Sequence, residues 1–518
     1  DRSFGEDDPH AILDRLRALQ ARNAELRREL DARPGQAAAE RLTQLEEQLR
    51  QARDDYAELR MNKAAVDAQL SRVRVDAAAL EQLRQEKEVL ELHREALTVA
   101  IDELRREVGE LREKGAGENP FTRCEAIDEH VELDAPIALD TRRIDLADFA
   151  DRIRHRIAHD PEKEGKHLYY TERDIRCFIA GLSMTHLHLL QGISGTGKTS
   201  LPRAFARAIA PPPKPSASRS SEGRSDDDAA ISVIEVQAGW RDQFDLIGHY
   251  NAFQRRFYED EFLQALYRAG TPRYADCPFI IVLDEMNLSR PEQYFATLLS
   301  ALERPDDARI KLLDHTPPKA PRRFVNNGRK LLLPSNVWFI GTANHDETTV
   351  EFADKTYDRA HVMELPRQRK GFVPDMRKAL PPTEPVALSA LQAAFDDAKA
   401  RYGEVTRAAM KALTDGIAPD LDRRFNVGWG NRLEDHAERY APVVRAAGGT
   451  MGEAIDHLVA TKILRKVRDR YDTTVEDLEA LKNALDTTWT AIDPKHAPTA
   501  SRALLDREIQ RKRGGASQ

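Results

Sequence analysis

The segment from Gly192 to Thr199 constrains the fold of this chain more than any other part of it. It reads Gly-Ile-Ser-Gly-Thr-Gly-Lys-Thr, which fits the pattern G-x-x-x-x-G-K-[ST], and it follows a short apolar run at 187–190 that predicts a strand. Glycines in such a loop allow successive backbone N–H groups to face an anion, and a helix that starts after the loop adds its N-terminal dipole. The sequence therefore predicts a strand, a phosphate-binding loop and a helix in direct succession.

The loop supplies the candidate residues for binding a nucleoside triphosphate. Lys198 can reach the β and γ oxygens of the phosphates, and the hydroxyl of Thr199 can ligate Mg²⁺. The candidate nucleotide-binding residues are Gly192, Ser194, Gly195, Thr196, Gly197, Lys198, Thr199 and Ser200.

A second motif ends another predicted strand with two acidic residues. The run 279–283 is fully apolar and leads into Asp284 and Glu285, an arrangement that matches the Walker B pattern. We expect Asp284 to hold Mg²⁺ and Glu285 to deprotonate the attacking water. An acidic pair at the end of a strand is common, but this one follows a phosphate loop by 85 residues, the separation of Thr199 and Asp284.

Three further polar residues are candidates for the catalytic site. Asn344 follows the predicted strand 337–340 and could bind the γ-phosphate or the lytic water. Arg359 precedes the predicted strand 361–365, where it could act as an arginine finger on a neighbouring subunit or be an ordinary surface residue. Arg432 lies at a predicted helix start in the C-terminal region and could contact the nucleotide from there.

Alternation of strands and helices after the loop indicates the fold class. Strands are predicted at 231–236, 279–285, 336–344 and 361–365, with helices at 262–269 and 293–303 between them. This order predicts a mainly parallel sheet covered by helices. Residues 211–230 lack apolar side chains almost entirely and predict a disordered surface loop.

The N-terminal part predicts a long coiled coil. Leucines recur every seven residues at 83, 90, 97, 104 and 111. An upstream seam over Leu59, Val66, Val73 and Leu80, extended by Leu42, Leu45 and Leu49, has the same period but another phase, which predicts a stammer between Leu80 and Leu83. From Leu42 to Leu111 a continuous rod would span on the order of 100 Å. Polar seam residues, among them Asn23, favour a dimer; a single solvated helix is the alternative. The pattern is interrupted near 34–35.

Composition limits the remaining possibilities. The chain has 518 residues, of which 32% are charged and 6% aromatic, so we expect several domains and much solvated helix. The net charge of −8 gives no overall attraction to nucleic acid, and direct contact with it is left open. Three scattered cysteines and the lack of an apolar run of about 18 residues favour a cytoplasmic location and no membrane.

Residues 180–470 resemble the AAA+ ATPases, and within them the branch that contains McrB-type restriction NTPases, MoxR-like chaperones and midasin. The segment 240–251 is similar to the W-x-D-x-x-D-L-x-G motif of this branch, and Asp284-Glu285-Met286-Asn287 followed by 298–303 is similar to DE-x-N with LL-x-x-LE. The resemblance implies a hexameric ring with Arg359 acting on the next subunit, mechanical work on a partner, and a β-hairpin within 304–336.

The nucleotide and the partner are less constrained by this resemblance. McrB GTPases carry N-T-x-D where this chain has Asn344-His345-Asp346-Glu347, and no N-K-x-D motif occurs, so we expect ATP with Mg²⁺ while GTP stays open. The expected partners are other copies of the chain, as a hexamer with paired coiled coils, and a protein that could be a nuclease effector of an antiviral defence system. A MoxR-like assembly chaperone and a nucleotide-switched scaffold with little turnover are the alternatives.

The sequence thus predicts an α/β P-loop NTPase of the AAA+ type with a C-terminal helical lid, preceded by a long α-helical coiled coil. The expected boundaries are 1–115 for the coiled coil, 116–180 for a linker and the entry to the AAA+ domain, 181–370 for the α/β core, and 371–518 for the helical lid with a solvated basic tail that includes Arg511 and Arg513.

Overall fold

The computed structural model describes residues 18–19, 21–25, 36–72, 84, 87–103, 119–159, 167–210, 230–304, 308–344, 350–367, 385–468 and 470–515. The chain divides into two compact units, one formed by 1–120 with 250–257 and the other by 121–249 with 258–518. Three expectations lie outside the described residues: the loop at 211–230 apart from Ala230, residues 345–347, and the seam residues Leu80, Leu83, Leu104 and Leu111 with the predicted stammer.

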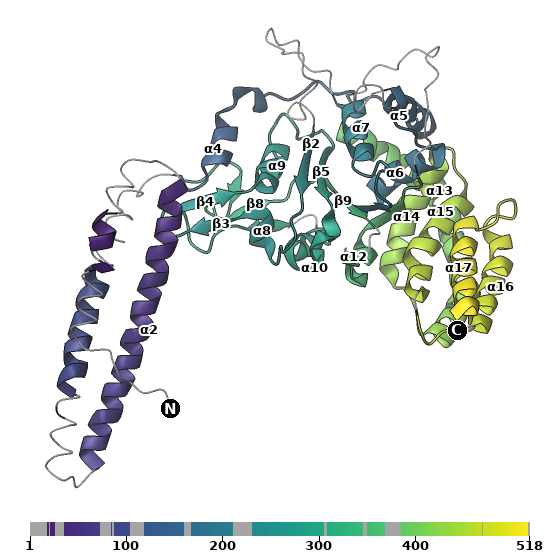
Figure 1. The fold of residues 1–518 in the computed structure, drawn as a ribbon. Coiled ribbons are helices and arrows are strands. Elements are labelled where there is room, and N and C mark those ends of the chain that lie inside the picture. The colour runs from purple at the N-terminus through teal and green to yellow at the C-terminus, as the bar shows by residue number, and fades with distance from the viewer. Residues whose placement is uncertain are drawn as a thin grey trace. The chain divides into compact units, whose positions relative to one another are not determined.

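Two helices dominate the described part of the first unit, α2 (Gln36–Arg72) and a helix at 87–103 (Figure 1). Lys63 Nζ lies 3.0 Å from Glu91 Oε1, so the two helices contact each other. In one continuous helix these residues, 28 positions apart, would be separated by about 42 Å. The chain therefore reverses direction between them, and the expectation of an uninterrupted rod from Leu42 to Leu111 is wrong. Two halves of one seam can pair within a chain as well as between chains.

A five-stranded parallel sheet forms the centre of the second unit. In the order of the sheet its strands are β10 (His361–Glu364), β1 (Leu187–Gly192), β9 (Val337–Asn344), β5 (Phe279–Asp284) and β2 (Ile231–Glu235). Every neighbouring pair is parallel, with Leu187 opposite Phe339 and Ile231 opposite Ile280. The predicted parallel α/β arrangement is confirmed.

Helices cover both faces of this sheet because its strands carry apolar side chains on both sides. One face, which includes Leu190, Val282 and Ile340, joins a core with α5 (Leu146–His159), α6 (Glu172–Met184) and α7 (Ser200–Ile209). On the opposite face Phe339 stacks on Phe262 of α9 (Glu261–Ala269), with ring centroids 5.7 Å apart. Successive side chains of each strand point to opposite faces of the sheet, so the unit has three layers: helices, the sheet, and helices again.

The start of α6 illustrates how the sequence fixes a helix end. Thr171 Oγ1 accepts a hydrogen bond from the Asp174 N–H at 3.1 Å, and the Asp174 carboxylate accepts one from the Thr171 N–H at 2.9 Å. This capping box pairs N–H groups that the first turn would otherwise leave without a partner. The helix therefore begins at Glu172 and leads directly into β1.

The C-terminal part of the second unit is helical. It comprises α13 (Leu388–Phe425), α14 (Asn431–Ala446), α15 (Met451–Leu458), the π-helix η5 (Val459–Ile463), the 3₁₀ helix η6 (Leu464–Val467), α16 (Val475–Ile492) and α17 (Thr499–Gly515). Leu505 of α17 is buried, and Arg511 and Arg513 pair with Glu508 and Glu479. The basic side chains of Arg511 and Arg513 are exposed, as expected, but they belong to a helix and not to a tail, because Leu505 and Ile509 on its other face are buried.

Short elements complete the second unit. They are α4 (Thr122–Glu129), η1 (Val131–Leu133), α8 (Gln243–Ile247), η3 (Met286–Leu288), α10 (Pro291–Tyr294), α11 (Ala296–Ala301), α12 (Asp354–Arg359), and the strands β6 (Arg309–Lys311), β7 (Phe324–Val325) and β8 (Lys330–Leu332). Two further strands, β3 (Gly248–Asn251) and β4 (Arg256–Glu259), pair with each other and have residues in each of the two units. The helix expected at 293–303 is thus split into α10 and α11.

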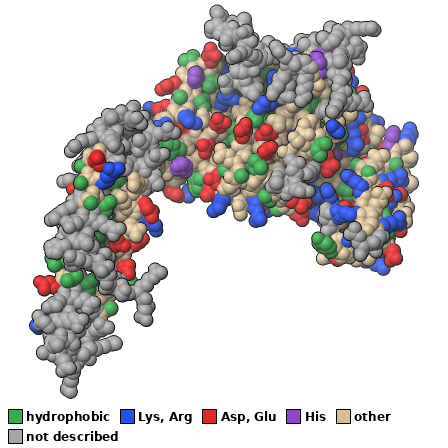
Figure 2. Space-filling model, viewed as in Figure 1, with side chains coloured by type: hydrophobic (Ala, Val, Ile, Leu, Met, Phe, Trp, Pro, Cys, Tyr) green, Lys and Arg blue, Asp and Glu red, His purple; other side chains and the backbone are tan. Residues whose placement is uncertain are grey.

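The segment 304–336 forms more than the implied β-hairpin. Its strands make an antiparallel sheet in the order β6-β8-β7, and the turn before β8 has positive φ at Asn326, Asn327 and Gly328. Among the described helices, none is long and apolar enough to cross a membrane. On the face shown in Figure 2, acidic and basic side chains are interspersed over the second unit.

Candidate functional site

The loop between β1 and α7 has the backbone that its glycines predict. Gly195 and Gly197 have φ values of 78° and 84°, and a Cβ atom on Gly192, whose φ is 151°, would lie 2.8 Å from the Leu365 carbonyl oxygen. Other residues rarely adopt these conformations. Ser194 and Gly195 are exposed, so the outer part of the loop is open to a ligand. The loop leads directly into α7, which starts at Ser200.

Buried contacts hold the inner part of the loop. Lys198 is 7% exposed, and its ammonium donates to the carbonyl oxygens of Gly192 at 3.0 Å and Ile193 at 2.8 Å. The hydroxyl of Thr196 also donates to Ile193, at 3.0 Å. The hydroxyl of Tyr170, a residue that the sequence analysis missed, donates to the Gly197 carbonyl at 2.8 Å. Carbonyl groups at the start of the loop therefore hold the Lys198 ammonium in position.

Parallel pairing brings the other candidate residues to the same edge of the sheet. Gly192, the last residue of β1, lies opposite Asn344, the last residue of β9. Leu283 of β5 lies opposite Gly341, so Asp284 and Glu285 follow at that same edge. In open parallel sheets ligands bind in the crevice outside these carboxyl ends. The structure thus gathers residues that are up to 152 positions apart in the sequence, counted from Gly192 to Asn344.

Asp284 is the centre of a short hydrogen-bond network. The hydroxyls of Thr199 and Thr342 both donate to its Oδ1, each at 2.6 Å. The first of these bonds joins the two residues that the sequence assigns to Mg²⁺. A hydroxyl beside a carboxylate is a donor set that suits this hard cation, which prefers oxygen ligands and retains several waters. These two side chains therefore fit a magnesium site.

Glu285 has a conformation that is unusual for a residue with a side chain. Its φ and ψ are 52° and 45°, in the left-handed region, and its N–H donates to the hydroxyl of Thr342 at 2.9 Å. The amide of Asn344 donates to its Oε1 at 3.2 Å. A second amide, from Asn287, donates to the Asn344 carbonyl at 3.0 Å. The candidate general base and the candidate sensor are thus in direct contact.

The two candidate arginines meet at another carboxylate. Arg359 Nε donates to Glu303 Oε1 at 2.8 Å, and the guanidinium of Arg432 binds the same oxygen. Burial disfavours the ionised form of Glu303, but the hydrogen bonds and charges of Arg359 and Arg432 outweigh it and lower the pKa of the carboxyl. Arg359 closes α12 and Arg432 lies in the first turn of α14. The sequence suggested a nucleotide role for each residue but not their pairing.

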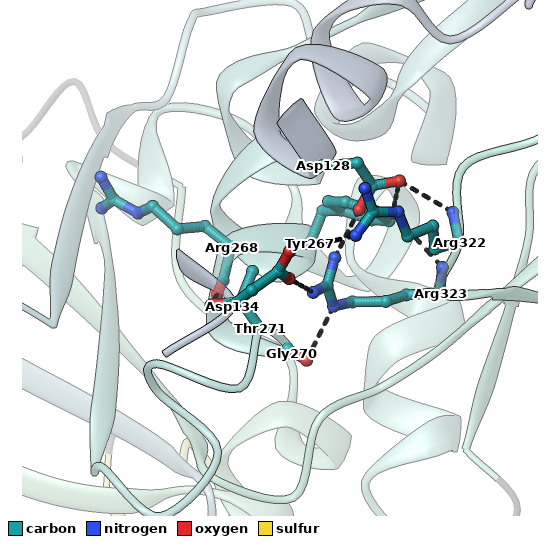
Figure 3. Close-up of polar contacts among 8 residues, drawn as sticks. All are labelled: Asp128, Asp134, Tyr267, Arg268, Gly270, Thr271, Arg322 and Arg323. Atoms are coloured by element: carbon teal, nitrogen blue, oxygen red, sulfur yellow. Dashed lines mark hydrogen bonds and ion pairs between the residues drawn. The ribbon is translucent and has the colours of Figure 1, made fainter. Parts of the chain in front are cut away.

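A second polar cluster, the Asp128 cluster, fastens α4 to the rest of its unit (Figure 3). Asp128 is 7% exposed and accepts from the Tyr267 hydroxyl at 2.7 Å, from the Arg322 N–H at 2.8 Å and from the Arg323 guanidinium at 2.5 Å. Arg323 also donates to the Gly270 carbonyl at 3.1 Å and pairs with Asp134 at 3.4 Å. This cluster ties α4 and η1 to α9 and to the segment before β7.

A third polar cluster, the histidine cluster, lies between the sheet and the C-terminal helices. It consists of His188 of β1, His361 of β10, His436 of α14 and His457 of α15, all buried. The rings of His188 and His361 are 5.0 Å apart, and those of His361 and His457 are 5.1 Å apart. Burial lowers the pKa of His188 to about 4 and those of His436 and His457 to about 3. The cluster is therefore neutral at pH 7.

Of the site residues that the sequence analysis did not identify, only Thr342 could have been found from a local pattern. Thr342 and Asn344 are two positions apart on one strand, so their side chains point to the same face. A polar residue two positions before a candidate sensor is thus itself a candidate. Tyr170 and Glu303 had no such local signal, since their partners lie 27 and 56 positions away.

Comparison of the chain with protein-family models gave no match, and comparison with curated proteins gave no relative.

Proposed function

We propose that this chain is an ATP-hydrolysing P-loop NTPase of the AAA+ type. The observation that carries the proposal is the convergence, at one edge of a parallel sheet, of the glycine loop with Thr199, Asp284, Glu285 and Asn344. The order of the strands supports it further. In the sheet, β1 lies between β10 and β9. The chain runs from β1 to β2 on the β9 side of β1, and later from β9 to β10 on its other side, so the strand order reverses at β1. In open parallel sheets, ligands bind at the carboxyl ends of the strands where the order reverses in this way.

The loop residues would bind the phosphates of the substrate. Backbone N–H groups of 194–199 and the N-terminus of α7 offer positive electrostatic potential, and the Lys198 ammonium adds a full charge. Thr199 and Asp284 would hold Mg²⁺, which when bound neutralises charge on the phosphate oxygens. Lys198 would exchange its present carbonyl partners, Gly192 and Ile193, for phosphate oxygens.

Glu285 would act as the general base. A water oxygen attacks the γ phosphorus, the bond from that phosphorus to the β–γ bridging oxygen breaks, and the water proton passes to the Glu285 carboxylate. The products are ADP and inorganic phosphate. The Asn344 amide, which already donates to Glu285 Oε1, would orient this carboxylate toward the water.

The resemblance to the McrB and MoxR branch extends the proposal to a ring. A hexamer would place Arg359 at the nucleotide of the next subunit, with Arg432 beside it because both bind Glu303. Hydrolysis would then drive remodelling of a partner protein or nucleoprotein complex, and the N-terminal helices would serve oligomerisation or docking. Neighbouring genes would separate the two branch-specific roles, since an adjacent nuclease gene favours a defence role over an assembly chaperone.

Steady-state hydrolysis of ATP and GTP on size-fractionated protein tests the proposal. We expect ATP turnover in the oligomeric fractions, and a loss of about 10²-fold or more in Glu285→Gln with nucleotide binding retained. Glu364→Gln is the matched control, because Glu364 is exposed and ends β10, the neighbour of β1, at the same edge of the sheet.

Two results would contradict the proposal. Unchanged turnover in Glu285→Gln would remove the assigned base, and failure of the wild-type protein to bind either nucleotide would remove the site itself. A preference for GTP would instead move the protein toward the McrB GTPases.

A further inference from the structure

Thr342 occupies a buried position between the two acidic residues of the site. It lies on β9, is 1% exposed, and comes two residues before Asn344. Its hydroxyl donates to Asp284 Oδ1 at 2.6 Å and accepts from the Glu285 N–H at 2.9 Å. A hydroxyl has one proton to donate, so this proton is committed to Asp284 while a lone pair serves Glu285.

The bond to Asp284 reaches the carboxylate from the sheet rather than from the loop. Thr199 contacts the same oxygen, but Thr199 belongs to the loop that carries the phosphate-binding groups. Thr342 is fixed by the parallel pairing of β9 with β1, in which it lies opposite Leu190. The strand hydroxyl can therefore hold the orientation of Asp284 when the hydroxyl of Thr199 turns to another partner.

The bond to Glu285 supports a strained piece of backbone. A left-handed conformation is unfavourable for a residue that has a Cβ atom, so surrounding contacts must maintain it. The Thr342 hydroxyl contacts the N–H group of Glu285, and Asn344 contacts its carboxylate from the same face of β9. Backbone and side chain of Glu285 are thus both held by this one strand.

We propose that Thr342 is a positioning residue, whose single hydroxyl holds the metal-binding carboxylate Asp284 and the general base Glu285 in register. The inference rests on the proposed function, because it assigns Thr342 a part in the same hydrolysis. Thr342 would touch neither nucleotide nor water, and would act only through these two acidic residues.

Replacement of the hydroxyl by a methyl group tests this role. In Thr342→Val we expect kcat to fall about tenfold or more, as for loss of a hydrogen bond to a charged group, and the Mg²⁺ concentration for half-maximal turnover to rise. Nucleotide affinity measured without Mg²⁺ should change less than about threefold, since the loop is intact. Thr342→Ser keeps the hydroxyl and should recover most of both losses.

Thr406→Val is the matched control. Thr406 is also fully buried, but it lies in α13 and its hydroxyl donates to the carbonyl of Tyr402 in the same helix, so the variant should keep wild-type kcat and Mg²⁺ dependence. If Thr342→Val unfolds early, Thr342→Ala removes the hydroxyl without adding a methyl group and serves the same test.

The outcomes separate this inference from the proposed function. Wild-type kcat and Mg²⁺ dependence in Thr342→Val would overturn the positioning role while leaving an active enzyme. A Thr342→Ser variant as impaired as Thr342→Val would also overturn it, because shape rather than the hydroxyl would then matter. A wild-type protein that neither binds nor hydrolyses nucleotide would overturn both.

Discussion

The Asp128 cluster and the histidine cluster both attach peripheral segments to the α/β core, but by opposite means. Around Asp128 a buried carboxylate meets a guanidinium, a phenol and a backbone N–H, each with a hydrogen bond (Figure 3). In the histidine cluster the rings pack on one another, and both ring nitrogens of His361 are buried without a hydrogen-bond partner among the described residues. One attachment is charged and directional, and the other is neutral because burial keeps it so.

The two attachments therefore respond differently to a change of pH and to substitution of their side chains. A buried ion pair tolerates a change of pH near neutrality, but the loss of one partner leaves an uncompensated charge. A neutral aromatic cluster tolerates a change of ring, but acid threatens it because protonation would place positive charges next to one another. Lys462, whose pKa burial lowers to about 7, adds to this second tendency, since its charge acts on His361, His436 and His457.

The largest expected effect follows removal of the carboxylate at the centre of the charged cluster. Asp128→Ala leaves the Arg323 guanidinium, 18% exposed at its side chain, without its closest partner, and should lower the free energy of unfolding by about 3–5 kcal/mol. Urea unfolding at pH 7 measures this. Asp128→Asn retains an acceptor for the Tyr267 hydroxyl and should cost less. Equal stability of wild type and Asp128→Ala would show that the cluster does not fasten α4.

The histidine cluster should make stability depend on pH below neutrality. The folded-state pKa values lie below the ordinary value of 6.5, so between pH 6.5 and about 4 the unfolded chain binds more protons than the folded protein. The free energy of unfolding should therefore decrease as the pH is lowered through this window, by up to about 1.4 kcal/mol per pH unit for each histidine. Thermal melts at pH 7.5, 6.5 and 5.5 measure the slope.

A ring exchange isolates one histidine from the rest of the chain. His457 stacks on Tyr440 with ring centroids 5.3 Å apart, so His457→Phe preserves the packing. In this variant the number of protons taken up on unfolding below pH 6.5 should decrease by about one, and stability should depend less steeply on pH. His496→Phe is the control, because His496 is exposed. An unchanged slope in His457→Phe would assign the acid sensitivity to other groups.

The smallest expected effect tests the geometry of the charged cluster rather than its charge. Arg323→Lys keeps the positive charge beside Asp128 but cannot also donate to Gly270 and Asp134, and it loses the guanidinium over the Tyr267 ring at 5.3 Å. We expect a loss of about 1 kcal/mol in the same urea titration. A loss as large as that of Asp128→Ala would mean that fork geometry, and not charge neutralisation, determines the attachment.

The strands of the central sheet and the conformation of the glycine loop could be predicted from the sequence, because both depend on residues close together in the chain. The strands β1, β2, β5, β9 and β10 and the positive φ values of Gly195 and Gly197 follow from apolar runs and from glycine spacing. Parallel pairing then explains why Asp284 and Asn344 end at the same edge as the loop. The reversal between Lys63 and Glu91 was not predicted, because a heptad seam specifies that a helix pairs but not with which helix.

Contacts between distant segments account for the rest. Nothing near Arg359 or Arg432 in the sequence points to Glu303, which lies 56 and 129 positions away. The Asp128 cluster joins residues up to 195 positions apart, and the histidine cluster forms only when α14 and α15 bring Tyr440 and His457 against His361 of β10. Such pairings depend on the tertiary fold and leave no periodic trace in one sequence.

The left-handed backbone at Glu285 places this residue between two opposing selective demands. Folding alone would favour glycine or asparagine at position 285, since either adopts φ near 50° at less cost. Neither carries a carboxylate. Glycine or asparagine at position 285 should therefore raise the melting temperature and, under the proposed function, remove hydrolysis in the same step, so that stability and activity would oppose each other at this residue.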